Sequence, residues 1–270
     1  MVDDRLDSVR TLVIDWDAPW FRAVAEHGRA VEGERDARSA LGAAASRLGI
    51  RTASGRPIRF AAPGAAGASA YEEHIHRTGE VPTRDNLHDF FNALVWLTFP
   101  RAKAALNALQ ATAIARDGVG PRRGALRDAA TLIDENALLL VTRRDDLVDA
   151  LAAHDWRRLF VGHRAAWRAE VRAIVFGHAL MEKLTAPYRG VTAHALHVRL
   201  APDAPLATID AAIAAALDDG LAPGRLRPLP VLGIPGWADN QDATYYEDAS
   251  VFRPARSARA TEARAPGSRP

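Results

Sequence analysis

One predicted helix carries four polar side chains on a single face. They are Asp85, His88, Asp89 and Asn92, spaced i, i+3, i+4 and i+7 along the chain. The residues that follow, 93–99, are apolar almost without interruption, which indicates that this helix is buried. A buried polar group without a partner costs about 1–3 kcal/mol, so this group must be bonded internally or must bind something. The pattern therefore has two interpretations: a structural network that begins with a helix cap, or a metal or acid–base site.

A second pair of residues that could take part in catalysis or metal binding is His178 and Glu182. They lie in the stretch 171–184, whose pattern predicts a helix. Their i, i+4 spacing allows the imidazole and the carboxylate to bind one metal, or allows the carboxylate to orient the imidazole. Apolar residues flank both, so we expect a half-buried position. His and Glu also occur four residues apart by chance in many helices, so the spacing alone does not decide.

Two further histidines lie in the predicted strand 190–200. His194 and His197 are three residues apart and would therefore project from opposite faces of a regular strand. We expect His194, which follows Thr192, to point inward. Asp134 and Glu135 lie where a turn is expected, so we interpret them as turn residues rather than catalytic ones.

These residues support two hypotheses about function. In the first, the buried His, Asp, Asn and Glu groups are structural, since no motif of the common nucleotide-binding proteins, zinc proteases or serine hydrolases is present and no cofactor is recognised. In the second, the protein is a metal-dependent hydrolase, in its narrower form acting on phosphodiesters, and the metal is Zn, Mn or Mg. The catalytic candidates are His88, Asp89, Asn92, His178 and Glu182. The metal-ligand candidates are His88, Asp89, His178, Glu182 and His194.

The elements that would position these residues are mostly helices. Apolar periodicity and capping residues predict helices over 20–26, 30–48, 86–99, 101–116, 145–153, 156–168, 171–184 and 206–217, and a brief element over 71–77. Strands are expected at 58–62 and 190–200, and a β-hairpin at 130–142 with its turn at Glu135-Asn136. We therefore expect an α+β fold: one mostly helical domain over 1–252, with a loop insertion at 53–70 and a short β-hairpin and a few minor strands.

Composition narrows the class of protein. The chain has 270 residues, of which 48% are hydrophobic and 25% charged, as in ordinary globular proteins. Because it contains no cysteine, disulfides, thiolate metal sites and cysteine nucleophiles are excluded. We find no secretory signal and no apolar run of membrane-spanning length, so we expect a cytoplasmic protein that does not bind membranes. Only Lys103 and Lys183 among the basic residues are lysine, and we draw no function from this arginine bias.

The formal net charge of +2 is concentrated at the end of the chain. Residues 253–270 contain five arginines and one glutamate, which leaves about −2 for residues 1–252. The folded body therefore lacks the basic patch that phosphate binding requires, and we expect no nucleic-acid partner for it. We expect the Arg/Ala/Pro-rich tail to be disordered.

The segment 229–237, rich in proline and glycine and ending in Trp237, is apolar and cannot form a regular strand. We expect it to pack across the core as a closing strap; the alternative is that Trp237 anchors a partner. Partners and the oligomeric state are otherwise not indicated by the sequence.

Several motifs extend along the chain. The longest is TGEVPTRDNLHDFFNALVW at 78–96, followed by FPRAK at 99–103 and LN at 106–107. Further motifs are DEN at 134–136, VFGHAL with EK at 175–183, TAHA at 192–195 and PLPVLGIPGW at 228–237. Taken together, residues 10–254 resemble a bacterial family, the domain of unknown function 3025 (DUF3025). Ala137 departs from the family pattern, which has glycine after DEN. The resemblance implies an identity but no activity.

Overall fold

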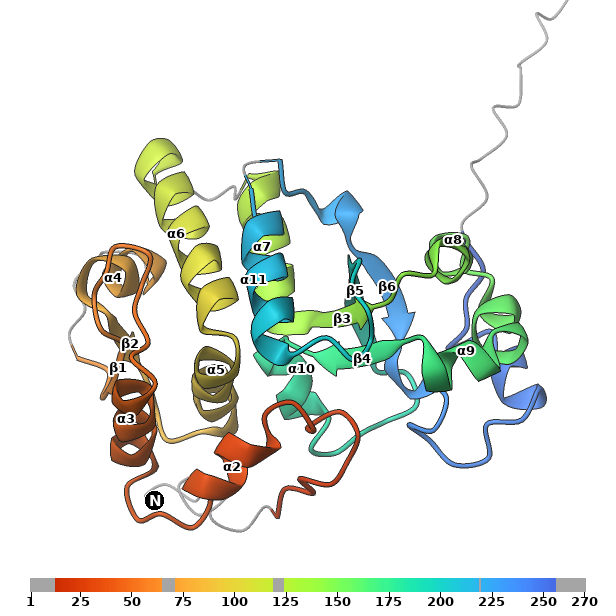
Figure 1. Ribbon diagram of the computed structural model, residues 1–270, viewed down its shortest axis with the longest axis horizontal. Coiled ribbons are helices and arrows are strands. Elements are labelled where there is room, and N and C mark those ends of the chain that lie inside the picture. Colours follow the sequence, from red (N-terminus) through yellow and green to blue (C-terminus); the bar gives the residue numbers. More distant parts are fainter. Residues whose placement is uncertain (1–12, 65–70, 119–123, 219, 256–270) are drawn as a thin grey trace, which may run out of the picture.

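The computed structural model describes residues 13–64, 71–118, 124–218 and 220–255 (Figure 1). The α-helices are α2 (Ala25–Val31), α3 (Ala37–Arg47), α4 (Tyr71–Thr78), α5 (Leu87–Thr98), α6 (Pro100–Asp117), α7 (Ala125–Asn136), α8 (Asp145–Ala152), α9 (Arg164–Ala169), α10 (His178–Lys183) and α11 (Leu206–Ala216). A π-helical turn η1 (Arg157–Gly162) precedes α9, and short 3-10 turns are η2 (Pro223–Arg225), η3 (Val231–Gly233) and η4 (Thr244–Glu247). The strands are β1 (Arg59–Ala61), β2 (Glu80–Pro82), β3 (Ala137–Val141), β4 (Arg172–Val175), β5 (Thr192–Val198) and β6 (Arg227–Pro230).

The larger sheet has the order β4-β3-β5-β6. Strand β3 lies in its interior, antiparallel to β4 and parallel to β5, and β6 pairs antiparallel to β5. All five residues of β3 (ALLLV) are buried, as expected for an inner strand covered on both faces. The smaller sheet pairs β1 and β2 in parallel. In Figure 1, α5 and α6 lie between this small sheet and the large one.

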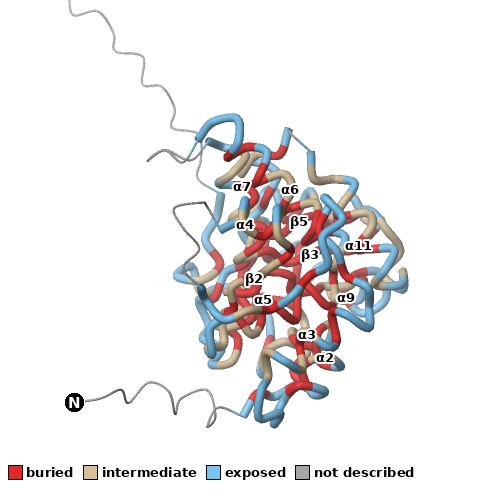
Figure 2. The backbone as a smooth tube through the Cα atoms, turned by 90° about the vertical axis from the view of Figure 1, so that its left-hand side faces the viewer, coloured by how far each residue is buried: buried red, intermediate tan, exposed pale blue. Residues whose placement is uncertain are grey.

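One continuous hydrophobic core joins these parts. Buried residues run along α5, α6, β3 and β5 through the centre of the molecule (Figure 2). Helix α5 is apolar on most of its surface, and Phe91, Leu94 and Trp96 are almost completely buried. Each such side chain contributes about 1.5–3 kcal/mol through removal from water, which fixes α5 in place. None of the helices in the described part of the chain combines the length and apolarity needed to cross a membrane.

The two helices that hold most of the polar residues begin at defined points. Asn86 caps α5, because its side-chain oxygen accepts a hydrogen bond from the backbone N–H of Asp89 at 2.8 Å. Helix α6 starts at Pro100 and has no cap of its own. Instead, the buried carboxylate of Asp210 in α11 accepts the backbone N–H groups of Arg101 at 3.0 Å and Ala102 at 2.8 Å. A side chain from a distant helix therefore caps α6.

We predict that Asp210→Ala lowers the free energy of unfolding by about 2 kcal/mol, because it leaves two N–H groups at the start of α6 without acceptors. Asp210→Asn retains one side-chain oxygen and should lose less. Asp36→Ala, which removes an exposed cap of α3, is a matched control with an expected loss of about 1 kcal/mol or less. Urea unfolding followed by tryptophan fluorescence measures all three. A loss in Asp210→Ala no larger than that of the control would contradict the prediction.

The expected α+β, mostly helical class is confirmed, and so are the helices near 86–99, 101–116, 145–153 and 206–217. Several local predictions were wrong. Residues 20–24 form turns, so the first helix, α2, begins only at Ala25. The predicted helix 30–48 is interrupted after Val31, where Gly33 has a φ of 85°, and resumes as α3. The hairpin at 130–142 does not form, because α7 continues through Asn136 and only the second half of the segment, β3, is a strand. The predicted helix 171–184 is divided into β4 and α10, because β4 pairs with the interior strand β3. Most of the tail 253–270 lies outside the described residues.

The segment 229–237 packs across the core, as the strap interpretation expected. The expectation that it cannot form a regular strand was wrong at its start, because Leu229 and Pro230 belong to β6 and pair with β5. Leu229, Val231 and Ile234 are buried. Gln241 stabilises the segment, because its Nε2 donates hydrogen bonds to the backbone carbonyls of Leu232 and Ile234. Trp237 is only partly buried and contacts Trp20 edge to face, with ring centroids 6.1 Å apart. Within the described residues, this segment therefore closes the domain's own core.

Candidate functional site

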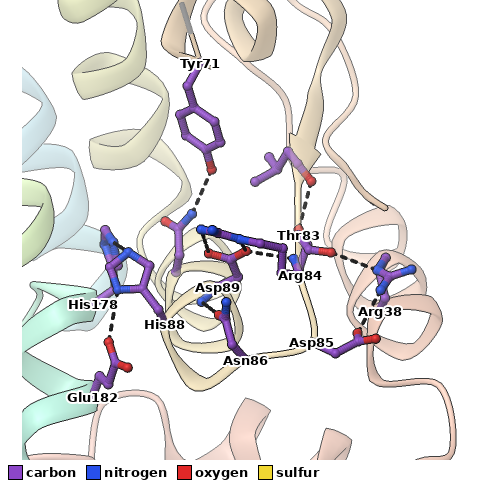
Figure 3. A network of polar contacts seen from close by, with 12 residues as sticks. Arg38, Tyr71, Thr83, Arg84, Asp85, Asn86, His88, Asp89, His178 and Glu182 are labelled. Carbon is purple, nitrogen blue, oxygen red and sulfur yellow. Dashed lines mark hydrogen bonds and ion pairs between the residues drawn. The ribbon is translucent and has the colours of Figure 1, made fainter. Parts of the chain in front are cut away.

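Polar side chains gather where α5, α6, α7 and α10 meet, and Figure 3 shows His88 of α5 beside His178 and Glu182 of α10. Helix α5 contributes His88 and Asn92, and α10 contributes His178 and Glu182. Helix α10 can approach α7 this closely because residue 177 is glycine: its backbone N–H donates to the carbonyl of Ala137 at 2.9 Å. A Cβ atom there would lie 2.4 Å from the carbonyl oxygen of Glu135. The glycine before His178 thus fixes the position of the whole helix.

His88 is oriented by a carboxylate. Its Nδ1 lies 3.0 Å from Oε2 of Glu182, and Figure 3 shows Glu182 reaching up from α10 to the ring. An ionised carboxylate accepts a hydrogen bond from Nδ1–H, so this contact leaves the proton of a neutral His88 on Nδ1 and a lone pair on Nε2. The side chains are 35% and 43% exposed, so solvent reaches this end of the cluster.

His178 faces His88 through the same ring atom. The two Nε2 atoms are 3.0 Å apart, and the rings are nearly perpendicular with centroids 4.4 Å apart. The distance between the ring centroids is greater than the distance between the Nε2 atoms, but by less than two ring radii. For rings that met head-on the difference would be the full two radii, so these rings meet at an angle. We call these two residues the His88–His178 pair. His178 is 6% exposed, so the pair extends from the surface into the interior.

Behind His178 lies a buried charged group. Nδ1 of His178 is 3.9 Å from Oδ2 of Asp134, and Asp134 forms an ion pair with Nζ of Lys103 through its other oxygen. Lys103 also donates to Oδ1 of Asn92 at 2.9 Å and lies over the ring of Trp96. We call Asn92, Lys103 and Asp134 the lysine cluster; all three are buried. Asn92 in turn donates to the hydroxyl of Tyr71 at 3.2 Å.

The pKa values of the buried groups follow from this arrangement. Burial acts to raise the pKa of Asp134, but the charge of Lys103, assisted by His178, outweighs it, so the pKa lies below its usual value. Burial lowers the pKa of His178 to about 4, in spite of the opposing influence of Asp134. Nδ1 of His178 has no hydrogen-bond partner among the described residues, and a proton on it would face the ionised Asp134. With the Glu182 contact, this tautomer leaves a lone pair on both Nε2 atoms, whereas the other tautomer of His178 donates its Nε2–H to His88.

Glu72 of α4 is a second carboxylate beside the lysine cluster. Asn107 donates to its Oε2 at 2.6 Å. Burial, together with the charge of Asp134, raises the pKa of Glu72 to about 7. A carboxyl whose pKa is higher in the folded than in the unfolded state adds stability that is present at acid pH and is lost as the pH rises through the folded value.

We therefore predict that Glu72→Gln stabilises the protein by about 1–3 kcal/mol at pH 8 and changes its stability little at pH 4.5, where the native carboxyl is already protonated. Glutamine keeps an oxygen for Asn107. Glu73→Gln, on the exposed side of the same helix, is the control and should show no such pH dependence. Chemical unfolding at the two pH values measures the difference. An equal effect of Glu72→Gln at both values would contradict the prediction.

The structure brings some of the predicted residues together and separates others. His88, His178 and Glu182 are in direct contact, and Asn92 joins them through the lysine cluster. Asp89 does not point to the pair: its carboxylate accepts the backbone N–H of Arg84 at 2.7 Å and the Arg84 guanidinium at 2.9 and 3.2 Å. His194 lies on β5 opposite Ala137 and Pro228, and its buried Nδ1 has no partner in the described structure.

Two members of the site were missed from the sequence. Asp134, interpreted as a turn residue, is a buried member of α7. Lys103 was not predicted to belong to the site. Its residue type could have indicated it, because Lys103 is one of only two lysines in an arginine-rich chain. The other, Lys183, donates to Asn136 beside the same junction of α7 and α10. Within the described residues, no group of three or more His, Cys, Asp or Glu side chains has the arrangement of a closed metal site.

Fold and site together define an α+β protein with a His–His–carboxylate centre at a junction of four helices. A family model described as a protein of unknown function (DUF3025) matches residues 58–256, which include every residue of this centre. The chain belongs to that family, as its motifs indicated. No curated protein matches the chain, and neither does any solved structure. The description of the family names no activity, so the function has to be argued from the site.

Proposed function

We propose that the protein is a hydrolase that activates water at the His88–His178 pair. The observation that carries the proposal is the 3.0 Å separation of the two Nε2 atoms, each on a ring whose Nδ1 faces a carboxylate. At that distance the two Nε2 atoms share either a proton, in an N–H···N hydrogen bond, or a metal ion that lies beside both lone pairs. A centre that holds and exchanges a cation at the solvent-exposed edge of the cluster is suited to acid–base chemistry.

The proposed chemistry needs only water as nucleophile. The chain has no cysteine, and in the described part no serine or threonine hydroxyl is hydrogen-bonded to either imidazole. The oxygen of water bonds to the carbon or phosphorus of an ester, and its proton passes to the pair. The pair returns a proton to the departing oxygen as the ester bond breaks, so the centre ends as it began. Glu182 keeps the His88 ring in position throughout.

Phosphodiesters are the first substrate class to test. Figure 3 shows the Arg84 guanidinium lying over Asp89, one residue along from His88. The Arg84 side chain is 65% exposed although its Nε and one terminal nitrogen are bonded to Asp89. An arginine held in this way presents its remaining N–H groups to solvent, and arginine is well suited to bind phosphate. We propose that a phosphoryl group of the substrate is bound there.

For the remaining polar groups, the contacts favour a structural role. Asp89 stabilises the turn into α5 through three hydrogen bonds from Arg84. In the interior, Lys103 donates hydrogen bonds to both Asp134 and Asn92. We propose that the lysine cluster supports His178 from behind and does not touch the substrate.

The test is hydrolysis of nitrophenyl esters of a carboxylic acid, a phosphate monoester and a phosphate diester, each with and without added Mn²⁺ or Zn²⁺. We expect activity on at least one class, reduced at least 100-fold in His88→Ala and His178→Asn. His194→Ala is the matched control and should retain activity. If no class is hydrolysed under any condition, or if His88→Ala remains fully active, the proposal is wrong.

A further inference from the structure

The His88–His178 pair has the geometry of two ligands of one metal ion. The rings are nearly perpendicular and meet at an angle, with Nε2 atoms 3.0 Å apart. Ligands in adjacent positions around a cation are bent toward it in this way, whereas a linear hydrogen bond between the rings would place the centroids farther apart. We propose that His88 and His178 bind a single divalent transition-metal ion through these Nε2 atoms. The inference rests on the proposed function only in identifying that ion as the cation of the centre. With the ion bound, the imidazoles would hold the ion in place of a shared proton, and the ion would supply the activation of water.

The distance between the two Nε2 atoms indicates which metal ions fit the pair. Two metal–nitrogen bonds of about 2.1 Å that span 3.0 Å enclose an angle of about 90°. This is the angle between neighbouring ligands of an octahedral ion, so Mn²⁺, Co²⁺ and Ni²⁺ fit the pair as it stands. Tetrahedral Zn²⁺ requires the nitrogens to separate by about 0.4 Å more. Mg²⁺, which prefers oxygen ligands, does not suit two imidazoles.

The group behind the His88 ring matches what a metal requires of its ligands, whereas Nδ1 of His178 has no hydrogen-bond partner among the described residues. Histidine ligands donate their second ring N–H to a carboxylate or carbonyl, which fixes the ring and makes the free nitrogen more basic. Glu182 occupies this position on His88 at 3.0 Å, and Asp134 lies on the corresponding side of His178 at 3.9 Å. Glu182 is therefore an outer support of the site, not a ligand as the sequence suggested. Asp89 is held by Arg84, and His194 belongs to β5.

Two protein ligands leave most positions around the ion for water or substrate. An open site of this kind is what metal-assisted hydrolysis uses, because the ion lowers the pKa of a bound water. The partial exposure of His88 and Glu182 gives the ion a route from solvent. Since no third protein ligand is in place among the described residues, we expect weaker binding than in a closed structural site. The metal must therefore be supplied in the experiment, not sought in the purified protein.

The test is titration of the full chain, purified without a histidine tag and treated with EDTA, with Co²⁺. We expect one saturable site, seen in the visible absorption of Co²⁺ and by calorimetry. Affinity should fall at least 10-fold in His88→Gln, a partly exposed position where folding should be preserved, and likewise in His178→Asn. Glu182→Gln should weaken binding about 10-fold through loss of the outer support. His194→Ala is the control and should bind Co²⁺ as the native chain does.

Absence of saturable binding up to millimolar Co²⁺ would overturn the proposal, and so would unchanged affinity in folded His88→Gln. Circular dichroism and thermal unfolding verify that each variant is folded. The metal site and the proposed function can fail separately. Stoichiometric binding without hydrolysis of any ester class supports the site and contradicts the function. Hydrolysis that survives EDTA in a protein without a Co²⁺ site contradicts the metal and leaves the function standing.

Discussion

Replacement of Lys103 by methionine should lower the free energy of unfolding by about 3–5 kcal/mol, since it leaves a buried carboxylate without its counter-charge. Methionine has a similar length and fills the same space beside Trp96. The loss therefore comes from Asp134 and from Asn92, which both lose the ammonium group that they contact in the native protein. Desolvation makes an unpaired buried charge costly whatever else the residue does.

The double variant Lys103→Met/Asp134→Asn should recover a large part of this loss, because it removes the stranded charge. The control is Lys183→Met, which changes the other lysine, an exposed residue bonded to Asn136, and should cost less than about 0.5 kcal/mol. Urea unfolding followed by circular dichroism gives all four values. If Lys103→Met costs less than 1 kcal/mol, or if the second change brings no recovery, the lysine cluster is not the buried ion pair described above.

Gly177→Ala should disrupt both the fold and the site. The new methyl group would lie 2.4 Å from the carbonyl oxygen of Glu135 and 2.5 Å from the backbone nitrogen of Asn136. These are backbone atoms at the end of α7 and cannot rotate away, so α10 must move. We expect a loss of about 3 kcal/mol, as for an overpacked interior position. Because α10 carries both His178 and Glu182, Co²⁺ binding and ester hydrolysis should fall together.

Gly42→Ala provides the matched control for this substitution. Gly42 lies inside α3, and nothing lies within 4 Å of the position that its Cβ would occupy. Alanine there should stabilise the helix by about 0.5–1 kcal/mol. Thermal unfolding and Co²⁺ titration of the two variants make the comparison. Native stability in Gly177→Ala, with Co²⁺ binding intact, would show that α10 is not fixed by this close approach.

Local signals predicted the helices around the site well. Asn86 and Pro100 mark the starts of α5 and α6, and both act as expected from their chemistry. The spacing of His88, Asp89 and Asn92 placed them near one another but not with the same partners. His88 contacts α10, Asp89 contacts the preceding turn and Asn92 contacts α6. Sequence spacing defines neighbours on a helix, whereas the partner depends on what packs against each position.

The secondary-structure predictions were wrong where a segment's structure depends on a contact with residues distant in the chain. Residues 171–175 read as the start of a helix, yet they become β4 because β3 offers an unpaired edge. The short apolar run 130–134 fits either a strand or a helix, and periodicity cannot separate the two. The position of Asp134 followed from that error: in a turn it would be exposed, whereas in α7 it faces Lys103. The pairing of His88 with His178 has no local signature at all.

The contact between His88 and His178 joins residues 90 positions apart, and that between His88 and Glu182 joins residues 94 apart. Contacts of such high sequence separation form late in folding, since the intervening chain must first be ordered. The centre is therefore absent from a nascent chain until α10 has been synthesised and has docked on α5. Metal binding, measured during refolding from urea, should appear with the slowest phase and so report completion of the native state.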